Sequence, residues 1–149
     1  MRISTKGRYS LEAILLLAIH HDSKDKMGTP YLSTREIAKQ TGISEGYLEQ
    51  LFILLRKSGL IAGVRGAQGG YFLERKPHEI TVGEILRTVE ASLKPTPCVE
   101  TAYCPNEDKC SSHGTWSTLY LTINEYIDGL SISDLLNDYK KNPRADYSI

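Results

Sequence analysis

The chain has 149 residues, zero net charge and 40% hydrophobic residues, enough to bury the core of one domain without disulfides or a structural metal. Its first 75 residues hold 11 Lys and Arg against 7 Asp and Glu, and this basic half favours a polyanionic partner. The odd number of cysteines, 3, excludes a framework that pairs all of them in disulfides and is typical of a reducing compartment.

The first predicted helix runs to about His21, and Ser4 or Thr5 can cap its start. Its apolar residues cover more than one face, which predicts a helix that is buried on several sides or shared with a second subunit. The apolar run at residues 11–19 contains Glu12, is too short to span a bilayer and precedes no small-residue cleavage site. We therefore expect a cytoplasmic protein without a membrane partner.

Two helices with a glycine turn between them are predicted next. Ser33 and Glu36 form a capping box at the start of the second helix, and Gly42 ends that helix. Ser44 caps the third helix, which has one apolar stripe and an opposite face of polar and charged residues. The stripe consists of Leu48, Leu51, Phe52 and Leu55.

A β-hairpin is predicted after the third helix. Residues 60–65 and 71–73 read as two short strands, and the glycines between them predict a wide hairpin tip. Helix, short helix, glycine turn, helix and hairpin is the order of a winged helix-turn-helix. The predicted fold is therefore mainly α with a small β-hairpin wing, and residues 1–80 form its DNA-binding domain.

In this fold the third helix would enter the major groove of DNA. Gln50 can pair with adenine and Glu49 can accept a hydrogen bond from cytosine, although a solvated helix face would also explain Glu49. Arg65 at the hairpin tip suits a narrow minor groove. The predicted DNA-binding residues are Lys6, Arg8, Ser44, Glu45, Tyr47, Glu49, Gln50, Arg56, Arg65 and Gly66.

Residues 81–140 are predicted to hold a cysteine-bearing loop and dimerisation helices, followed by a disordered tail at residues 141–149. Thr81 and Glu84 predict another capping box at the start of a short amphipathic helix. The long helix after the loop has an apolar residue every three or four positions, as in a seam between paired helices; an ordinary amphipathic helix shows the same pattern. The seam consists of Trp116, Leu119, Ile123, Tyr126 and Leu130.

All three cysteines lie in that loop, as Cys98, Cys104 and Cys110, and His113 follows them. Three thiolates and one imidazole are a complete set of four ligands for a metal centre. Zinc accepts this set, but closed zinc sites usually have shorter gaps between their cysteines. Unmetallated thiols that sense redox state are a further alternative. The sequence has no nucleophile elbow, phosphate loop or zinc-protease motif that indicates an enzyme.

Together these motifs resemble the Rrf-two family of bacterial winged-helix regulators, and most closely its branch that senses iron–sulfur clusters. The resemblance rests on residues 1–9, 42–44, 47–52, 55–57, 59–60, 64–66, 69–71 and 82–85, and on the cysteine spacing. It implies a transcriptional regulator that reports iron–sulfur cluster status and binds palindromic double-stranded DNA as a homodimer joined by its long helix.

The resemblance also implies a 2Fe–2S cluster on Cys98, Cys104, Cys110 and His113, with the iron–sulfur assembly machinery as its donor. A related branch of the family places an acidic ligand near the start of the first helix, where this chain has Arg8. Glu12, one turn further on, remains an alternative ligand to His113. A cluster-free repressor of redox or cysteine metabolism is the alternative function.

Overall fold

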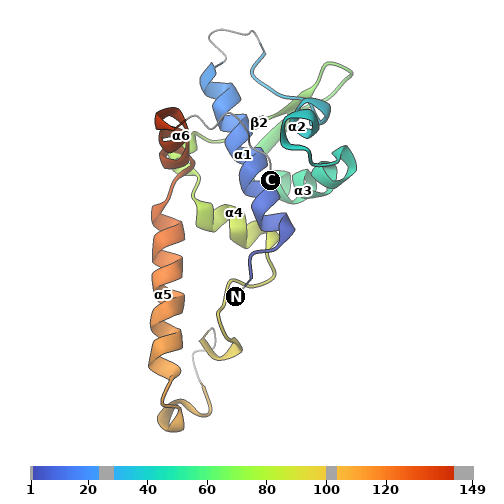
Figure 1. Ribbon diagram of the computed structural model, residues 1–149. Helices are drawn as coiled ribbons and strands as arrows, with labels where there is room; N and C mark the ends of the chain where they lie inside the picture. The colour runs from blue at the N-terminus through green and yellow to red at the C-terminus, as the bar shows by residue number, and fades with distance from the viewer. Residues whose placement is uncertain (1, 24–28, 100–103, 143–149) are drawn as a thin grey trace.

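The computed structural model describes residues 2–23, 29–99 and 104–142. It confirms a mainly helical fold with one antiparallel hairpin, and α5 extends away from the body formed by the other elements (Figure 1). Within the described residues, short 3-10 turns occupy Pro77–Glu79, Pro97–Val99 and Glu107–Lys109. The main elements are α1 (Thr5–Ser23), α2 (Thr34–Thr41), α3 (Glu45–Lys57), β1 (Ile61–Val64), β2 (Gly70–Leu73), α4 (Val82–Val89), α5 (His113–Gly129) and α6 (Ile132–Lys141).

The capping residues determine where α2 and α3 begin and end, as predicted. The hydroxyl of Ser33 accepts a hydrogen bond from the Glu36 amide at 3.2 Å, and the Glu36 carboxylate accepts one from the Ser33 amide at 2.8 Å. Gly42 ends α2 with a φ of 74°, a left-handed conformation that glycine adopts without steric cost. Ser44 caps α3 by accepting from the amide of Tyr47 at 3.3 Å.

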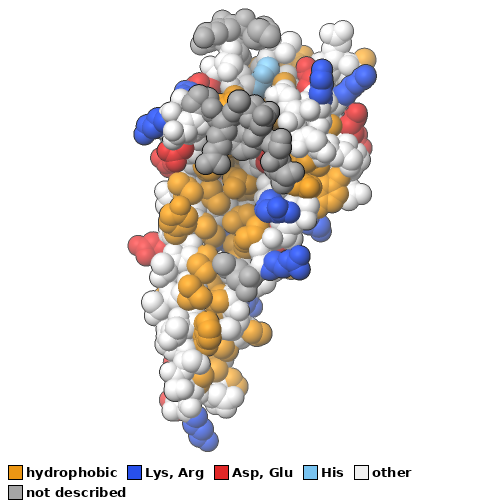
Figure 2. Space-filling view, in the orientation of Figure 1, with side chains coloured by type: hydrophobic (Ala, Val, Ile, Leu, Met, Phe, Trp, Pro, Cys, Tyr) orange, Lys and Arg blue, Asp and Glu red, His pale blue; other side chains and the backbone are white. Residues whose placement is uncertain are grey.

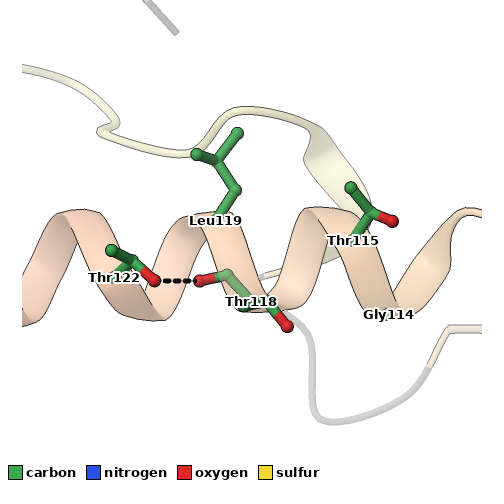
Figure 3. Close-up of a pocket in the computed structure, with 5 residues that line it drawn as sticks. All are labelled: Gly114, Thr115, Thr118, Leu119 and Thr122. Atoms are coloured by element: carbon green, nitrogen blue, oxygen red, sulfur yellow. Dashed lines mark hydrogen bonds between the residues drawn. The ribbon is translucent and has the colours of Figure 1, made fainter.

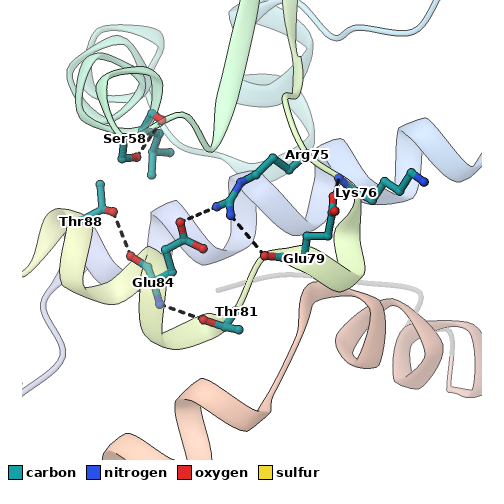
Figure 4. Close-up of polar contacts among 8 residues, drawn as sticks. Ser58, Arg75, Lys76, Glu79, Thr81, Glu84 and Thr88 are labelled. Atoms are coloured by element: carbon teal, nitrogen blue, oxygen red, sulfur yellow. Dashed lines mark hydrogen bonds and ion pairs between the residues drawn. The ribbon is translucent and has the colours of Figure 1, made fainter.

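The predicted capping box at the start of α4 is only half formed. The hydroxyl of Thr81 accepts from the Glu84 amide at 3.2 Å, but the Glu84 carboxylate pairs with Arg75 (Figure 4). A guanidinium forms a stronger, charge-assisted hydrogen bond than a backbone amide does. Arg75 also donates to the Glu79 carbonyl at 3.4 Å, so Glu84 links α4 to the segment that follows the hairpin.

One hydrophobic core joins α1, α3, the hairpin, α4 and α6. The four predicted core residues of α3 are at most 1% exposed, and the Phe52 ring lies 4.5 Å from that of Tyr71 on β2. Ile132 of α6 is fully buried in the same core. A second cluster, which includes Leu86 and Ile127, holds α4 against α5. Of the two alternatives predicted for α1, burial on several sides within its own chain agrees with its seven buried residues.

Gly70 lies where β2 meets the segment that leads into α2. Leu32 and Tyr71 exchange two backbone hydrogen bonds there, of 3.0 and 2.7 Å. A Cβ atom on Gly70 would overlap the Leu32 carbonyl and lie 2.8 Å from the Ser33 nitrogen. We expect Gly70→Ala to lower the free energy of unfolding by about 2–3 kcal/mol, because the backbone must shift to make room for the alanine Cβ atom. Urea unfolding measures the change.

The matched control is Gly46→Ala in α3, where a Cβ atom would meet nothing within 4 Å. Alanine favours a helix by about 1 kcal/mol relative to glycine, so this variant should be at least as stable as the parent protein. Equal losses of stability in the two variants would show that steric overlap at Gly70 is not the cause.

Candidate nucleic-acid interface and cysteine loop

A groove between α3 and the hairpin brings together half of the predicted DNA-binding residues. Glu45, Glu49 and Arg56 of α3 lie on one side of this groove. Arg65 and Gly66 at the tip of the hairpin lie on the other side. All five residues are exposed. α3 and the hairpin therefore form the two sides of one exposed surface.

Arg35 is a candidate DNA-binding residue that the sequence motifs did not reveal. It is exposed in the first turn of α2 and lines the same groove as Glu49 and Arg65. Sequence distance hides this relationship, since the backbone hydrogen bonds between Leu32 and Tyr71 are what bring the start of α2 to the hairpin. A cation at the start of the helix-turn-helix is the signal that could have identified it.

The remaining predicted contacts on α3 differ in their surroundings. Ser44 is exposed and its hydroxyl caps the helix, and Gln50 is exposed on the face away from the core. Tyr47 is half-buried, and its ring packs edge-on against Tyr9 of α1 at 5.8 Å. The ring of Tyr47 therefore also joins α3 to α1.

The first turn of α1 presents a second cationic surface. Lys6 and Arg8 are exposed there, and Arg8 shares a shallow groove with Arg2, which was not among the predicted contacts. The Glu90 carboxylate accepts hydrogen bonds from the Ser4 amide and hydroxyl at 2.8 and 2.9 Å. Since Glu90 follows α4 directly, it holds the start of α1 against the end of α4.

The four predicted metal ligands lie on the path from α4 to α5. Cys98 is in the turn Pro97–Val99, which contacts α5. The other two cysteines flank the turn Glu107–Lys109, and His113 is the first residue of α5. All three thiols are free and partly exposed.

Backbone hydrogen bonds tie three of the predicted ligands into one short path. The Glu107 amide donates to the Cys104 carbonyl at 3.1 Å, and the Cys110 amide donates to the Glu107 carbonyl at 3.4 Å. The His113 amide then donates to the Cys110 carbonyl at 3.3 Å. These residues therefore follow a continuous series of tight turns into α5.

The local environments of His113 and Cys110 suit metal ligands. Among the described residues, the buried Nδ1 of His113 has no hydrogen-bond partner, and its Nε2 lies 3.4 Å from the Ser117 hydroxyl. A buried imidazole nitrogen without a partner is available as a ligand. Hydrogen bonds from the Ser112 hydroxyl and amide, and from the His113 amide, lower the pKa of the Cys110 thiol, which favours the thiolate that binds metals.

The donor types fit an iron–sulfur cluster, but the side chains do not form one coordination group. Over residues 2–23, 29–99 and 104–142, no three His, Cys, Asp or Glu side chains are placed to share one ion. Glu12, the alternative ligand, has a buried carboxylate oxygen with no partner in the described part of the chain, and burial raises the pKa of this carboxyl.

Three of the five predicted seam residues expose apolar surface on α5. Trp116 is 37%, Leu119 41% and Tyr126 68% exposed, and hydrophobic side chains gather along the elongated part of the molecule (Figure 2). Leu119 lines a shallow groove together with small and hydroxyl-bearing residues (Figure 3). These are Gly114, Thr115, Thr118 and Thr122.

The other two seam residues pack against the chain's own core. Ile123 and Leu130 both contact the second hydrophobic cluster. Leu130 was predicted within the long helix, but it lies one residue past the end of α5 in an extended conformation. Its carbonyl accepts a hydrogen bond from the Val82 amide at 2.9 Å, which joins the end of α5 to the start of α4.

A membrane-spanning segment is not found among the described helices, since none is both long and apolar enough. Residues 24–28 of the predicted polar loop and residues 143–149 of the predicted tail lie outside the described residues. Lys141, the first residue of that predicted tail, is the last residue of α6.

Comparisons with known proteins agree with this architecture. The Rrf2 family, described as an iron-dependent transcriptional regulator, matches residues 3–138. The chain is 38% identical over 138 residues to the HTH-type transcriptional regulator IscR of Aliivibrio salmonicida, covering 93% of this chain and 79% of that protein.

Two solved structures have the same fold. The structure of T. potens IscR has a TM-score of 0.74 and 36% identity, covering 98% of this chain and 93% of that one. CymR (YrzC), the global cysteine regulator of B. subtilis, has a TM-score of 0.72 and 35% identity, covering 92% and 97%. Because the relatives are named as regulators, the predicted non-enzymatic role is confirmed. The chain belongs to the Rrf2 (Rrf-two) family of DNA-binding, winged-helix transcriptional regulators.

Proposed function

We propose that this regulator is a homodimer that binds palindromic operators and senses iron–sulfur cluster status through a 2Fe–2S cluster held by Cys98, Cys104, Cys110 and His113. The observation that carries the proposal is the position of His113. It is the first residue of the long helix, it follows a loop with three free thiols, and its buried Nδ1 has no partner among the described residues. This position joins the ligand set to the proposed dimer helix.

The groove between α3 and the hairpin suits double-stranded DNA. A helix of about 10–12 Å diameter fits a major groove about 12 Å wide, and Arg65 at the hairpin tip suits the neighbouring minor groove. Lys6 and Arg8 would contact phosphates, as would Arg35. In a symmetric dimer the two copies of α3 would read half-sites about 34–36 Å apart.

The proposed ligand set suits an iron–sulfur cluster that the protein can gain and lose. The cluster supplies a redox-active centre whose presence reports cluster supply. The neutral imidazole of His113 would make that centre less negative than four thiolates would. A regulator benefits from a centre that it can gain and lose, whereas an electron carrier holds its centre firmly.

Two contacts at α4 provide a route from the cysteine loop to the DNA-binding surface. Glu90, at the start of the loop, holds the Ser4 backbone at the beginning of α1. Arg87 donates to Asn124 of α5 at 2.9 Å and pairs with Asp128. A change in the loop would therefore act on both α1 and α5, and it would favour one spacing of the two DNA-binding surfaces over another.

The proposal includes a cytoplasmic location and the iron–sulfur assembly machinery as cluster donor. The three free thiols are stable in a reducing compartment, and operator DNA is available in the bacterial cytoplasm. The likeness to a cysteine regulator favours, as the second candidate, a cluster-free repressor of cysteine metabolism. Structural zinc at the same ligands is a third.

Anaerobic purification separates these functions. A visible absorption spectrum with an assay of iron and sulfide should show two of each per chain for one 2Fe–2S cluster, whereas zinc or free thiols would leave the protein colourless. DNase footprinting on genomic fragments should show a protected palindrome. A colourless, iron-free protein that still gives the full footprint would exclude cluster sensing.

Glu49 is expected to restrict the range of operators. Its carboxylate is repelled by phosphates and gains only where it accepts from a cytosine amino group. Glu49→Ala should therefore reduce discrimination at one base pair per half-site by about 1–3 kcal/mol, with little loss of affinity for other sequences. Binding constants for an operator and its single-base variants, at one salt concentration, measure this.

Arg56→Ala is the control on the same side of the groove. Loss of a phosphate contact weakens binding to all sequences about equally. Unchanged base preference in Glu49→Ala would assign Glu49 to the solvated face of the helix.

A further inference from the structure

Ile53 is an exposed apolar residue at the centre of the outward face of α3. Its side chain is 66% exposed, while the four core residues of this helix are at most 1% exposed. At about 100° per residue, Ile53 follows one turn after Glu49 and Gln50 and lies between them in angle around the helix. It therefore points away from the core.

Helix stability does not explain an isoleucine at this position. Isoleucine has a lower helix propensity than alanine or lysine, because its branched Cβ loses rotamer freedom. Single exposed apolar side chains are common on protein surfaces, but this one is flanked by the candidate base-reading residues Glu49 and Gln50. Because α3 is the helix proposed to enter the DNA major groove, the position of Ile53 on it indicates a contact with a DNA base.

We propose that Ile53 is a specificity-determining residue that contacts the C5-methyl group of thymine in the major groove. The inference rests on the proposed function, since it places α3 in that groove. The thymine methyl is the apolar group that the groove offers to a side chain. Since a helix rises about 1.5 Å per residue, Ile53 lies about 6 Å beyond Glu49 along the helix and would read a base pair one or two steps away.

The surroundings of Ile53 favour a base over a protein partner. Protein interfaces have a contiguous apolar centre, but the neighbours of Ile53 on this face include Gln50, Arg56 and Lys57. Elsewhere in the described residues, the exposed large hydrophobic side chains are Val64 on the hairpin and four residues of α5. Val64 lines the groove opposite α3, so it belongs to the same proposed DNA-binding surface.

The test uses a duplex that the protein itself selects from a random library. Each thymine is replaced in turn by deoxyuridine, which removes only the methyl group. With the parent protein, we expect replacement at one or two positions in each half-site to weaken binding about three- to tenfold. Ile53→Ala should bind the thymine duplex more weakly by the same factor and lose the deoxyuridine penalty at those positions.

Lys57→Ala, near the end of the same helix face, is the matched control. It should weaken binding to every duplex equally and retain the deoxyuridine penalties of the parent protein. Ile53→Ala introduces a stronger helix former at an exposed position, so it should fold, which circular dichroism checks.

The outcomes separate this inference from the proposed function. Sequence-specific binding with no deoxyuridine penalty, or with equal penalties in the parent protein and Ile53→Ala, would overturn the role of Ile53 alone. Failure of the parent protein to select any duplex would overturn the proposed function and this inference with it. Unchanged DNA binding by Ile53→Ala, together with lost transcriptional regulation, would instead assign Ile53 to a protein contact and overturn the inference.

Discussion

Cys104→Ala is expected to abolish cluster binding in protein prepared without oxygen. A 2Fe–2S cluster needs four protein ligands, and the three cysteines of this chain are its entire supply of thiols. Removing Cys104 would leave the proposed ligand set one short. The visible absorption of the parent protein should disappear, and the iron and sulfide contents should fall to background.

The control for this variant is Ser111→Ala, an exposed residue of the same loop with no proposed ligand role. It should retain the spectrum and the metal content of the parent protein. Full iron and sulfide in Cys104→Ala would exclude that residue as a ligand. Comparing operator affinities of the cluster-loaded parent protein and Cys104→Ala then tests coupling, because equal affinity on every operator would show that the cluster does not control binding.

Leu119→Asp is expected to separate the proposed dimer into monomers. Leu119 belongs to the predicted seam, is 41% exposed and lines the shallow groove along α5. A carboxylate buried in an apolar interface loses its hydration without gaining a partner. Sedimentation should show a monomer, and affinity for a full palindrome should fall by about 100-fold or more, because the two half-sites no longer bind as one unit.

Leu119→Met, which keeps the volume and apolar character of the side chain, is the control and should remain a dimer. A duplex with a single half-site should bind the parent protein, Leu119→Asp and Leu119→Met equally, which would show that α3 and the hairpin are intact. A dimeric Leu119→Asp would exclude this face of α5 as the interface.

The proposed metal ligands show how far the candidate site could be predicted. The residue types and spacing of the cysteines and His113 indicated the chemistry of the site. They did not predict that His113 would begin α5 with a buried nitrogen, nor that the Ser112 hydrogen bonds would lower the pKa of Cys110. Those properties depend on where the loop meets the helix.

Much of the fold could be predicted from the sequence because it depends on interactions between residues that are close in sequence. The Ser33–Glu36 capping box, the Gly42 helix end and the apolar stripe around Phe52 all act within one or two helical turns, so local hydrogen bonding and periodicity predict them. The hairpin was predicted for the same reason, since turn residues lie between its strands.

Contacts between distant segments decided the remaining features. Arg75 pairs with Glu84, so the capping box of α4 is only half formed, and the Val82 amide donates to the carbonyl of Leu130 just past α5. The hydrogen bonds between Leu32 and Tyr71 bring the start of α2, and with it Arg35, to the hairpin. Each of these interactions forms only when the core brings distant elements together, so no local pattern encodes its geometry.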